Sequence, residues 1–540
     1  MSMSRRRHYL LVPIVIAICA LTAGIFSGGG RASAATPSED AASQSLRTFS
    51  AVYDAVEKNF ADPVKPEKSV YKGAIPGMLR TLDPHSNFFD PRDFQELREG
   101  QRGTYYGVGM QVATRNGQTI VIAPFPGSPA AKAGLRPGDI IQMVNDTKTD
   151  GLTTTEVADL LRGPRSTKVQ VQVGREGVDM PVVFNIVRDE IPRFSVSGGF
   201  LLKPGIAFIR VESFNENTSQ EMEEKFKKLG EKNVQGLILD LRSNPGGLLN
   251  EGVDVASHYL KKGDLVVSHH GRSSPNKNYT APRDGSGKDY PIVVLVDRYT
   301  ASAAEIVSGA LQDHDRAWIL GENTFGKGLV QTVYPMGDNT GLALTTAHYY
   351  TPSGRLIQRD YSNISFLDYY THSNLELKNM QDVKTTDSGR TVYGGGGITP
   401  DEKYEPQLLN PFQISVRRKD AFFGFSAKYF GTRDTKLPQG WEPDAAILDQ
   451  FHGFLKEKEV EFTEPDYMAN RDWMRRELKR EMYVAAFSTD ESERVRFEQD
   501  PMVIRGMESL PKAKELLGNA KNMLVKRMNA QKNATVAAAR

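Results

Sequence analysis

Short apolar β-type runs alternate with amphipathic helical segments between Gly205 and Asp401, and this alternation constrains the fold more than any other feature of the chain. The β-type runs lie at 206–211, 236–241, 265–268, 292–296 and 317–320. A helix should open at Thr218, with Glu221 completing a capping box, and others should cover 248–260 and 302–312. Parallel strands need crossover connections, usually helices, so we expect an α/β core with a mixed, mostly parallel sheet.

Residues 103–190 have a different texture. Five short β-type runs lie at 107–112, 119–123, 140–144, 168–173 and 182–187. Between them we expect a short helix at 128–135, closed by a glycine, a turn at 136–139 and a second helix at 154–161. This pattern indicates a small β-rich domain inserted before the α/β core.

Helical regions are predicted on both sides of these domains. Residues 46–97 carry apolar side chains at helical spacing, which indicates a helical arm that either packs on the rest of the chain or joins a second copy. Charged residues and helix formers dominate after Pro411, and 529–540 are expected to lack order. The predicted domains are 1–35, 36–102 (arm), 103–190 (β-rich), 191–405 (core) and 406–540 (helical).

The N-terminal segment, residues 1–35, is predicted to direct export. Arg5, Arg6 and Arg7 precede an apolar run from Tyr9 to Phe26, and the small residues 32–34 follow. The run fits either a cleaved signal peptide, which we favour, or a retained membrane anchor. Both place the body of the protein outside the cytoplasm, in the periplasm or another extracytoplasmic space, and the anchor would also associate it with the membrane.

Two bulk properties exclude classes of function. The only cysteine, Cys19, lies inside the apolar run, so the exported body has no thiol nucleophile and no disulfide. The formal charge is +2, from 68 basic and 66 acidic residues, which gives no field that would attract nucleic acid, and we expect none as a partner.

Ser302 stands where the buried run 292–296 turns into a helix. Ligands of open α/β sheets bind beyond the carboxyl ends of the strands, and this strand delivers Ser302 there. The residue is either a nucleophile or simply the N-cap of the helix.

Lys327 follows Ser302 by 25 positions and lies between Gly326 and Gly328. Flanking glycines let the backbone bring an ammonium group into a tight site. Burial disfavours the charged form and lowers the pKa of a lysine, so a buried amine can accept the proton of a serine. The pair Ser302 and Lys327 therefore fits a nucleophile and its general base.

Ser302, Lys327 and Gln331, together with the sequence of residues 240–247, resemble the carboxyl-terminal processing peptidases. The resemblance implies a crotonase/ClpP-like core, a Ser nucleophile, a Lys base and a Gln that orients the amine. It also implies an oxyanion hole formed by the amide of Ala303 and by Gly246 or Gly247, of which we favour Gly246. Further matching motifs lie at 82–86, 161–164, 351–355 and 397–401, and the resemblance covers about 46–401.

Residues 103–190 resemble a PDZ domain, in which the loop of Tyr106, Gly107, Val108 and Gly109 precedes the peptide-binding strand. Consecutive amides in such a loop can bind a peptide carboxylate while the peptide adds a strand to the sheet edge. The resemblance implies that substrate C-termini bind here and regulate cleavage. Gly107 and Gly109 could instead only shape a tight turn.

These features predict a serine endopeptidase that cleaves exported proteins, recognised by their C-termini, through an acyl-enzyme mechanism without metal or cofactor. The alternative is an inactive scaffold whose PDZ domain binds C-termini. The sequence leaves open whether the chain forms a homo-oligomer.

Other motifs carry less weight. Residues 321–327 match a phosphate-binding loop, but Gly328 replaces the Ser or Thr that binds magnesium. Ser274 and Lys277 match the spacing of penicillin-binding enzymes, but Pro275 disfavours the required helical turn. His269 and His270 should point in opposite directions along a strand, and His314 is expected to be a surface histidine.

Overall fold

The first described helices form a unit of their own. The computed structural model describes residues 39–115, 117–362, 365–371, 379–431 and 436–538, and its contacts divide the chain after Ile75. The first unit contains α2 (Glu39–Asn59), whose apolar side chains are exposed, and the π-helix η1 (Glu67–Ala74). The division falls inside the predicted arm, and the export segment lies outside the described residues.

The second unit begins with the rest of that arm. It contains α3 (Ile75–Leu79) from its second residue on, β1 (Asn87–Phe89) and α4 (Pro91–Arg102). The Asp90 carboxylate accepts the amide of Asp93 and caps α4, which Pro91 starts with a preset φ.

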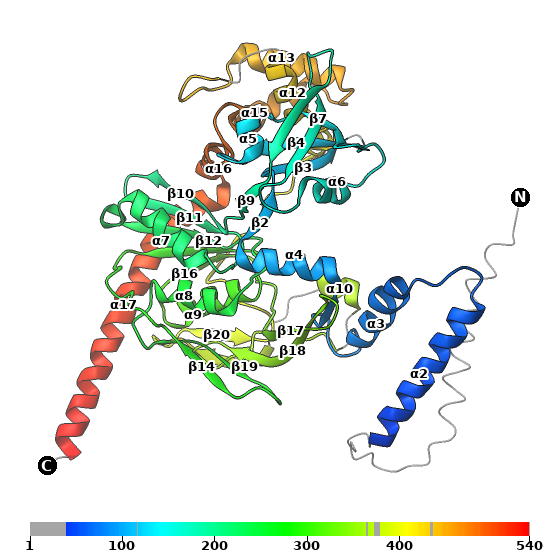
Figure 1. Cartoon of the computed structure of the whole chain (residues 1–540). Helices are drawn as coiled ribbons and strands as arrows, with labels where there is room; N and C mark the ends of the chain where they lie inside the picture. Colours follow the sequence, from blue (N-terminus) through cyan, green and yellow to red (C-terminus); the bar gives the residue numbers. More distant parts are fainter. Residues whose placement is uncertain (1–38, 116, 363–364, 372–378, 432–435, 539–540) are drawn as a thin grey trace, which may run out of the picture. The chain divides into compact units, whose positions relative to one another are not determined.

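An antiparallel sheet follows, in the order β3 (Met110–Arg115), β4 (Gln118–Pro124), β5 (Ile140–Val144), β7 (Lys168–Gly174) and β8 (Val182–Val187), with β6 (Thr147–Lys148) paired to β5 (Figure 1). Helices α5 (Pro129–Ala133) and α6 (Thr154–Leu161) belong to the same domain. Alternate residues of the strands fill its core, among them Val121, Val169, Val171 and Val173. Strand β3 lies at one edge of the sheet.

The central sheet has six strands, in the order β10 (Val196–Lys203), β11 (Ile206–Val211), β12 (Gly236–Asp240), β15 (Ile292–Val296), β16 (Trp318–Gly321) and β21 (Glu402–Lys403). Strand β10 pairs antiparallel with β11, and the other four pairings are parallel. Every residue of β12 and β15 is buried, as expected for strands covered on both faces.

Different helices cover the two faces of this sheet. Leu237, Leu239 and Val294 lie in a cluster with α7 (Thr218–Leu229), α8 (Leu249–Ser257) and α9 (Ala303–Asp313). The intervening Ile238, Val293 and Leu295 pack against residues of α16 (Thr489–Glu498) and α17 (Pro501–Ala538). The C-terminal helices therefore complete the core of the α/β domain.

Two local expectations were wrong. Residues 265–268 belong to β13 (Leu265–His270), which pairs antiparallel with β14 (Lys277–Thr280) and β18 (Gly341–Tyr350) in a second sheet with β1 and β17 (Leu329–Pro335). A short loop joins β13 to β14 where a crossover helix would be needed. Helix α7 begins at Thr218, as expected, but has no side-chain cap at Asn217 and no capping box, because Glu221 instead accepts the amides of Ser195 and Val196.

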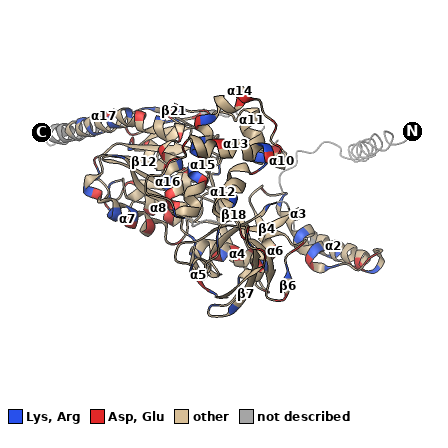
Figure 2. Ribbon diagram, turned by 90° about the horizontal axis from the view of Figure 1, so that it is seen from above, with Lys and Arg blue, Asp and Glu red and all other residues tan. Residues whose placement is uncertain are grey.

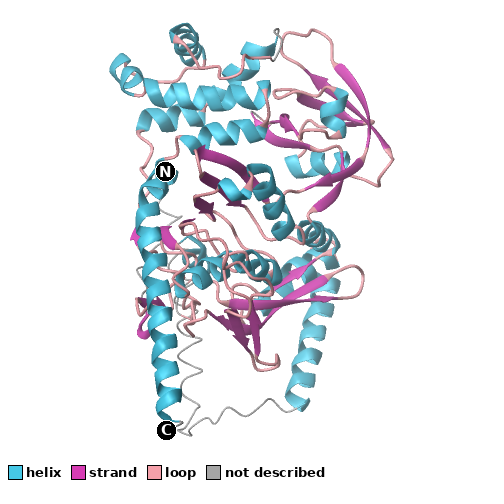
Figure 3. Cartoon of the chain, turned by 90° about the vertical axis from the view of Figure 1, so that its left-hand side faces the viewer, coloured by secondary structure: helices cyan, strands magenta, loops and turns pink. Residues whose placement is uncertain are grey.

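The region after Pro411 is helical, as predicted, with α11 (Pro411–Arg418), α12 (Ala421–Gly431), α13 (Ala445–Glu457), α14 (Glu464–Ala469) and α15 (Arg471–Ala486) packed around their own apolar cluster. Figure 3 shows α17 as one long helix that leads to the C-terminus. The expected loss of order from 529 is wrong, because the helix continues to Ala538 through a segment rich in alanine, the best helix former.

Acidic and basic residues are interspersed along the ribbon, in agreement with the balanced charge (Figure 2). Among the described residues, no helix combines the length and apolarity needed to span a bilayer.

Candidate active site

Ser302 lies at the turn from β15 into α9, in a strained backbone conformation. Its φ of 54° and ψ of −117° are rare for a residue with a side chain. The Ser302 side chain makes no capping hydrogen bond to the helix in the described part of the chain. Instead, the Ser302 amide donates to the Glu305 carboxylate at 2.9 Å. The hydroxyl is thus not used for capping.

Glu305 also holds the loop that carries Lys327. One carboxylate oxygen, Oε2, accepts the Lys327 amide at 2.9 Å, and the other, Oε1, accepts the Gly326 amide at 2.7 Å and the Thr324 hydroxyl at 2.5 Å. Glu305 is fully buried. One carboxylate therefore sets the positions of both the predicted nucleophile and the predicted base.

The Lys327 amine is bound by Gln331, a residue of strand β17. Lys327 Nζ donates to Gln331 Oε1 at 2.8 Å. Burial lowers the pKa of the Lys327 amine, although the carboxylates of Glu305 and Asp83 act in the opposite direction. This environment favours the neutral amine that a general base requires.

Ser302 and Lys327 line the same cavity of about 800 Å³, together with Gln331, Gly246 and Gly247. Within the described residues no hydrogen bond joins the Ser302 hydroxyl to the Lys327 amine. In the structure the Lys327 amine is hydrogen-bonded to Gln331, and Ser302 lines the same cavity.

The glycine turn after β12 packs directly on the start of α9. A Cβ on Gly246, whose φ is 95°, would lie 2.6 Å from Ser302 Cβ and 3.0 Å from the Ala303 nitrogen, so only glycine fits. Ala303 is the first residue of α9, and its amide has no intrahelical acceptor. The Gly246 amide donates to Asn244 Oδ1 at 2.8 Å, whereas the Gly247 amide has no acceptor among the described residues.

The motif at residues 82–86 supports Gln331, a contact that the sequence analysis did not foresee. Gln331 Nε2 donates to the backbone oxygen of His85, which leaves Oε1 facing Lys327. Asp83 Oδ1 accepts the amides of His85 and Ser86, each at 2.8 Å, and shapes the turn. An Asp-Pro-His-Ser sequence is a recognisable turn, but its partner is visible only in three dimensions.

The His85 side chain is a neutral neighbour of the base. Burial and the nearby Lys327 charge lower the pKa of the imidazole to about 3. Its Nε2 lies 2.8 Å from the hydroxyl of Tyr369, which is 1% exposed. A neutral imidazole adds no positive charge beside the Lys327 amine.

The predicted peptide-binding loop leads into the edge strand β3. Tyr106 and Gly107 end β2 (Thr104–Gly107), which pairs with β9 (Asp189–Pro192). Val108 is buried, its carbonyl accepts the amide of Ala130 at 2.8 Å, and Gly109 has a φ of 75°. The loop thus precedes a strand that has one unpaired edge among the described strands.

The competing motifs do not form sites. Gly328 leads into strand β17, not the helix that a phosphate-binding loop requires. His269 is buried and His270 is exposed, as expected for neighbours on a strand. The described residues contain no group of His, Cys, Asp and Glu that could hold a metal ion.

His314 is not the simple surface histidine that the sequence suggested. It lies at the C-terminal end of α9, and its side chain is only 15% exposed. Burial alone would lower its pKa, but hydrogen bonds to Asp387 and to the carbonyl of Leu265 raise the pKa to about 9. Its partners hold it away from Ser302, at the other end of the helix.

Comparison with known proteins agrees with this geometry. Residues 205–363 match the model of peptidase family S41, and residues 120–175 match a PDZ domain. The carboxy-terminal-processing protease of Bartonella bacilliformis is 36% identical over 327 residues, covering 60% of this chain and 75% of that protein. The carboxy-terminal processing protease CtpB of Bacillus subtilis is 30% identical over 383 residues, 70% of this chain and 77% of that protein.

A solved structure of a photosystem II D1 C-terminal processing protease is 31% identical, covers 67% of this chain and 88% of its own, and has a TM-score of 0.34. The family matches define a serine-type peptidase that carries a PDZ domain. The chain belongs to peptidase family S41, with the carboxyl-terminal processing proteases as its relatives.

Proposed function

We propose that Ser302 is the nucleophile of this peptidase and Lys327 its general base. The observation that carries the proposal is the Lys327 amine, whose pKa burial lowers and which Gln331 holds at the wall of a cavity shared with Ser302. Ser302 Oγ attacks the peptide carbonyl and gives its proton to Lys327, which passes it to the leaving amine. Water then hydrolyses the acyl-enzyme with the same base.

For this step the amine must approach the Ser302 hydroxyl. The backbone of His85 holds Gln331 in place. The long side chain of Lys327 can therefore rotate around this fixed acceptor while Nζ stays bonded to Gln331. The amide of Ala303 would then donate to the oxyanion together with the glycine turn. Gly246 could contribute only after leaving Asn244, whereas the Gly247 amide is already available.

The PDZ domain supplies a second recognition element. We propose that a substrate C-terminus binds along β3, the edge strand that follows the loop of residues 106–109, with its carboxylate at the loop amides. The names of the relatives, carboxy-terminal processing proteases, support this direction of substrate binding. A peptidase agrees better than an inactive scaffold with the retained Ser302, Lys327 and Gln331.

Several finer assignments belong to the same proposal. The core is a crotonase/ClpP-like domain at 191–405, with the PDZ domain at 103–190, helical regions at 36–102 and 406–540, and no metal or organic cofactor. The basic and apolar sequence of residues 1–35 supports export, with either cleavage or retention as an anchor. The exposed apolar residues of α2 are compatible with a homo-oligomer.

The test is proteolysis of an unfolded protein that carries a C-terminal peptide tag. The wild type should cleave it, and Ser302→Ala and Lys327→Ala should not, while Lys521→Ala, which removes an exposed lysine of α17, should behave as wild type. Cleavage by both active-site variants would refute the dyad. A substrate amidated at its C-terminus should be cleaved more slowly if the PDZ domain binds the carboxylate.

A further inference from the structure

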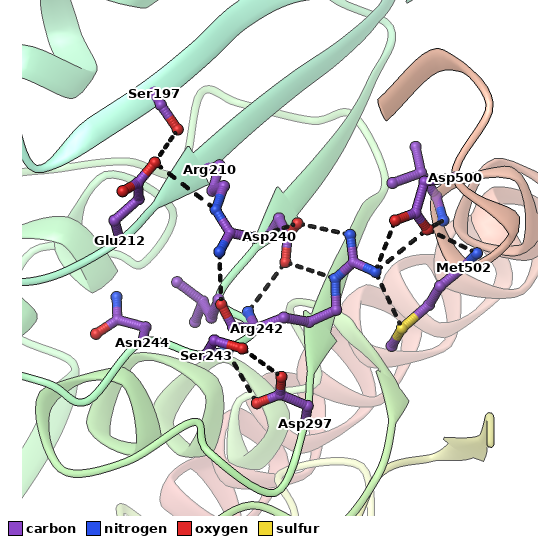
Figure 4. Close-up of polar contacts among 12 residues, drawn as sticks. Ser197, Arg210, Glu212, Asp240, Arg242, Ser243, Asn244, Asp297, Asp500 and Met502 are labelled. Atoms are coloured by element: carbon purple, nitrogen blue, oxygen red, sulfur yellow. Dashed lines mark hydrogen bonds and ion pairs between the residues drawn. The ribbon is translucent and has the colours of Figure 1, made fainter. Parts of the chain in front are cut away.

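A partly buried cluster of charged side chains joins the C-terminal helices to the turn beside Ser302 (Figure 4). Asp240, at the end of β12, is fully buried. Its Oδ2 accepts Arg210 Nη1 at 3.0 Å and Arg242 Nη2 at 2.8 Å, and its Oδ1 accepts Arg242 Nε at 2.9 Å. The fourth member, Asp500, precedes α17 and accepts Arg242 Nη1 at 3.2 and 3.1 Å.

Each arginine of this cluster faces two carboxylates. Asp240 pairs with both Arg210 and Arg242, Glu212 Oε1 also lies 3.8 Å from Arg210 Nε, and Asp500 also pairs with Arg242. The side chain of Arg242 is 16% exposed, so an unbalanced charge there would be costly. Burial opposes ionisation of Asp240, but Arg242 and Arg210 outweigh it and hold its pKa below the usual range. Asp500 is the second carboxylate that Arg242 contacts.

The same cluster fixes the backbone that leads into the glycine turn. The amide of Arg242 donates to Asp240 Oδ1 at 2.9 Å, and its carbonyl accepts Arg210 Nη2 at 3.1 Å. Ser243, with a φ of 58°, follows directly, and its amide and hydroxyl both donate to the Asp297 carboxylate at 2.9 Å. Hydrogen bonds therefore hold the amide and carbonyl of Arg242 and the amide of Ser243 before the turn begins.

Asn244 connects this fixed segment to the start of α9. It is fully buried, and its backbone oxygen accepts the amide of Ala301 at 2.9 Å. Its side-chain oxygen accepts the amide of Gly246 at 2.8 Å. A displacement of Arg242 would shift Asn244, two residues later, and the two hydrogen bonds of Asn244 would pass the shift to Gly246 and Ala301.

We propose that Arg242 and Asp500 are positioning residues for the peptidase reaction: Asp500 fixes Arg242, and Arg242 fixes the turn 243–247 against Ser302 and Ala303. The inference rests on the proposed role of that turn in the oxyanion hole. It gives the C-terminal region, which lies beyond the matched peptidase segment 205–363, an indirect part in catalysis, through the position of the turn.

The informative variant is Asp500→Asn. Asp500 Oδ1 also accepts the amides of Met502 and Val503, at 2.9 and 3.0 Å, and thereby caps α17. Asparagine caps helices as well as aspartate does, so the substitution keeps the cap at Oδ1, while it removes the charge and replaces the oxygen that accepts Arg242 Nη1 by an NH₂ group. Glu508→Gln is the matched control, because it makes the same chemical change on α17 at a side chain that is 58% exposed and paired with Arg505.

The measurements are kcat and KM for a fluorogenic peptide, and the affinity of a peptide aldehyde whose hemiacetal oxygen occupies the oxyanion position. Asp500→Asn should lower kcat roughly 10-fold, leave KM within about 2-fold, and weaken the aldehyde by a factor similar to that in kcat. Asp500→Glu, which restores the charge, should recover part of the loss, and Glu508→Gln should match the wild type.

Wild-type kcat and aldehyde affinity in Asp500→Asn would overturn the proposal. A fall in kcat that only matches the fraction of enzyme no longer labelled by a fluorophosphonate would also overturn it, because the variant would then be misfolded, not misaligned. The proposed function fails separately, if wild-type Ser302 is not labelled or if Ser302→Ala still cleaves the peptide.

Discussion

Replacing Glu305 by glutamine should disable the active site, mainly through the loss of hydrogen-bond acceptors. The carboxylate accepts four donors: the amides of Ser302 and Lys327 on one oxygen, and the Gly326 amide and Thr324 hydroxyl on the other. Glutamine has nearly the same shape but carries an NH₂ group in place of one oxygen. In either orientation of the new amide, that group faces backbone donors.

The cost follows from the number of amides left unpaired. If the NH₂ group replaces Oε2, the amides of Ser302 and Lys327 both lose their acceptor. If it replaces Oε1, the Gly326 amide does, while the Thr324 hydroxyl can rotate. A buried unpaired donor costs roughly 1–3 kcal/mol, so the folded state should lose about 1–6 kcal/mol. Movement of the loop to relieve the clash would displace Lys327, and every 1.4 kcal/mol added to the barrier lowers kcat about 10-fold.

Stability should be measured in the Ser302→Ala background, because an active peptidase would digest its own unfolded chains during the assay. Glu305→Gln should lower the urea midpoint in that background and should lower kcat at least about 10-fold when Ser302 is present. Glu498→Gln, at an exposed carboxylate on α16 that pairs with Arg494, should change neither. Wild-type kcat in Glu305→Gln would refute the view that one carboxylate positions both catalytic residues.

Three further predictions concern the same site. The kcat/KM of the wild type should rise with pH as the Lys327 amine loses its proton. Because burial lowers the pKa of this amine, the midpoint should lie below the ordinary lysine value of about 10.4. A midpoint at that ordinary value would contradict a buried base. Gly246→Ala should lower kcat at least about 100-fold, since the new Cβ would lie 2.6 Å from Ser302 Cβ, whereas Gly389→Ala, at a φ of 90° with open space around it, should retain activity. Asp83→Ala should lower kcat roughly 10-fold by releasing the turn that holds Gln331, whereas Asp284→Ala, at an exposed turn, should not. Equal activity of the two variants would show that the turn at residues 83–86 does not position the base.

Much of the local structure follows from the sequence because its signals are local. Strand 292–296 and helix 154–161 lie where they were predicted, since uninterrupted apolar runs, cap residues and glycines act on neighbouring residues. The nucleophile and the base could be proposed for the same reason: one follows a buried strand, and the other lies between two glycines.

The remaining features depend on residues that are distant in the sequence. Glu305 reads as an ordinary first-turn residue of α9, and only the fold brings its carboxylate to the loop of Lys327. The contact between His85 and Gln331 spans 246 positions, and that between Arg242 and Asp500 spans 258. The abundance of charged residues and helix formers predicted helices after Pro411 but could not indicate which surface α17 covers.

The position of α17 has a consequence for the order in which the protein can be completed. The face of the sheet that contains Ile238, Val293 and Leu295 is covered by residues such as Phe497, Val503 and Leu510, which the ribosome adds some 200 positions after the last of those strand residues. Until then an apolar surface stays open to water and to other chains. Asp500 belongs to the same late segment, so a chain that stops before it lacks the contact with Arg242 that is proposed to position the turn 243–247.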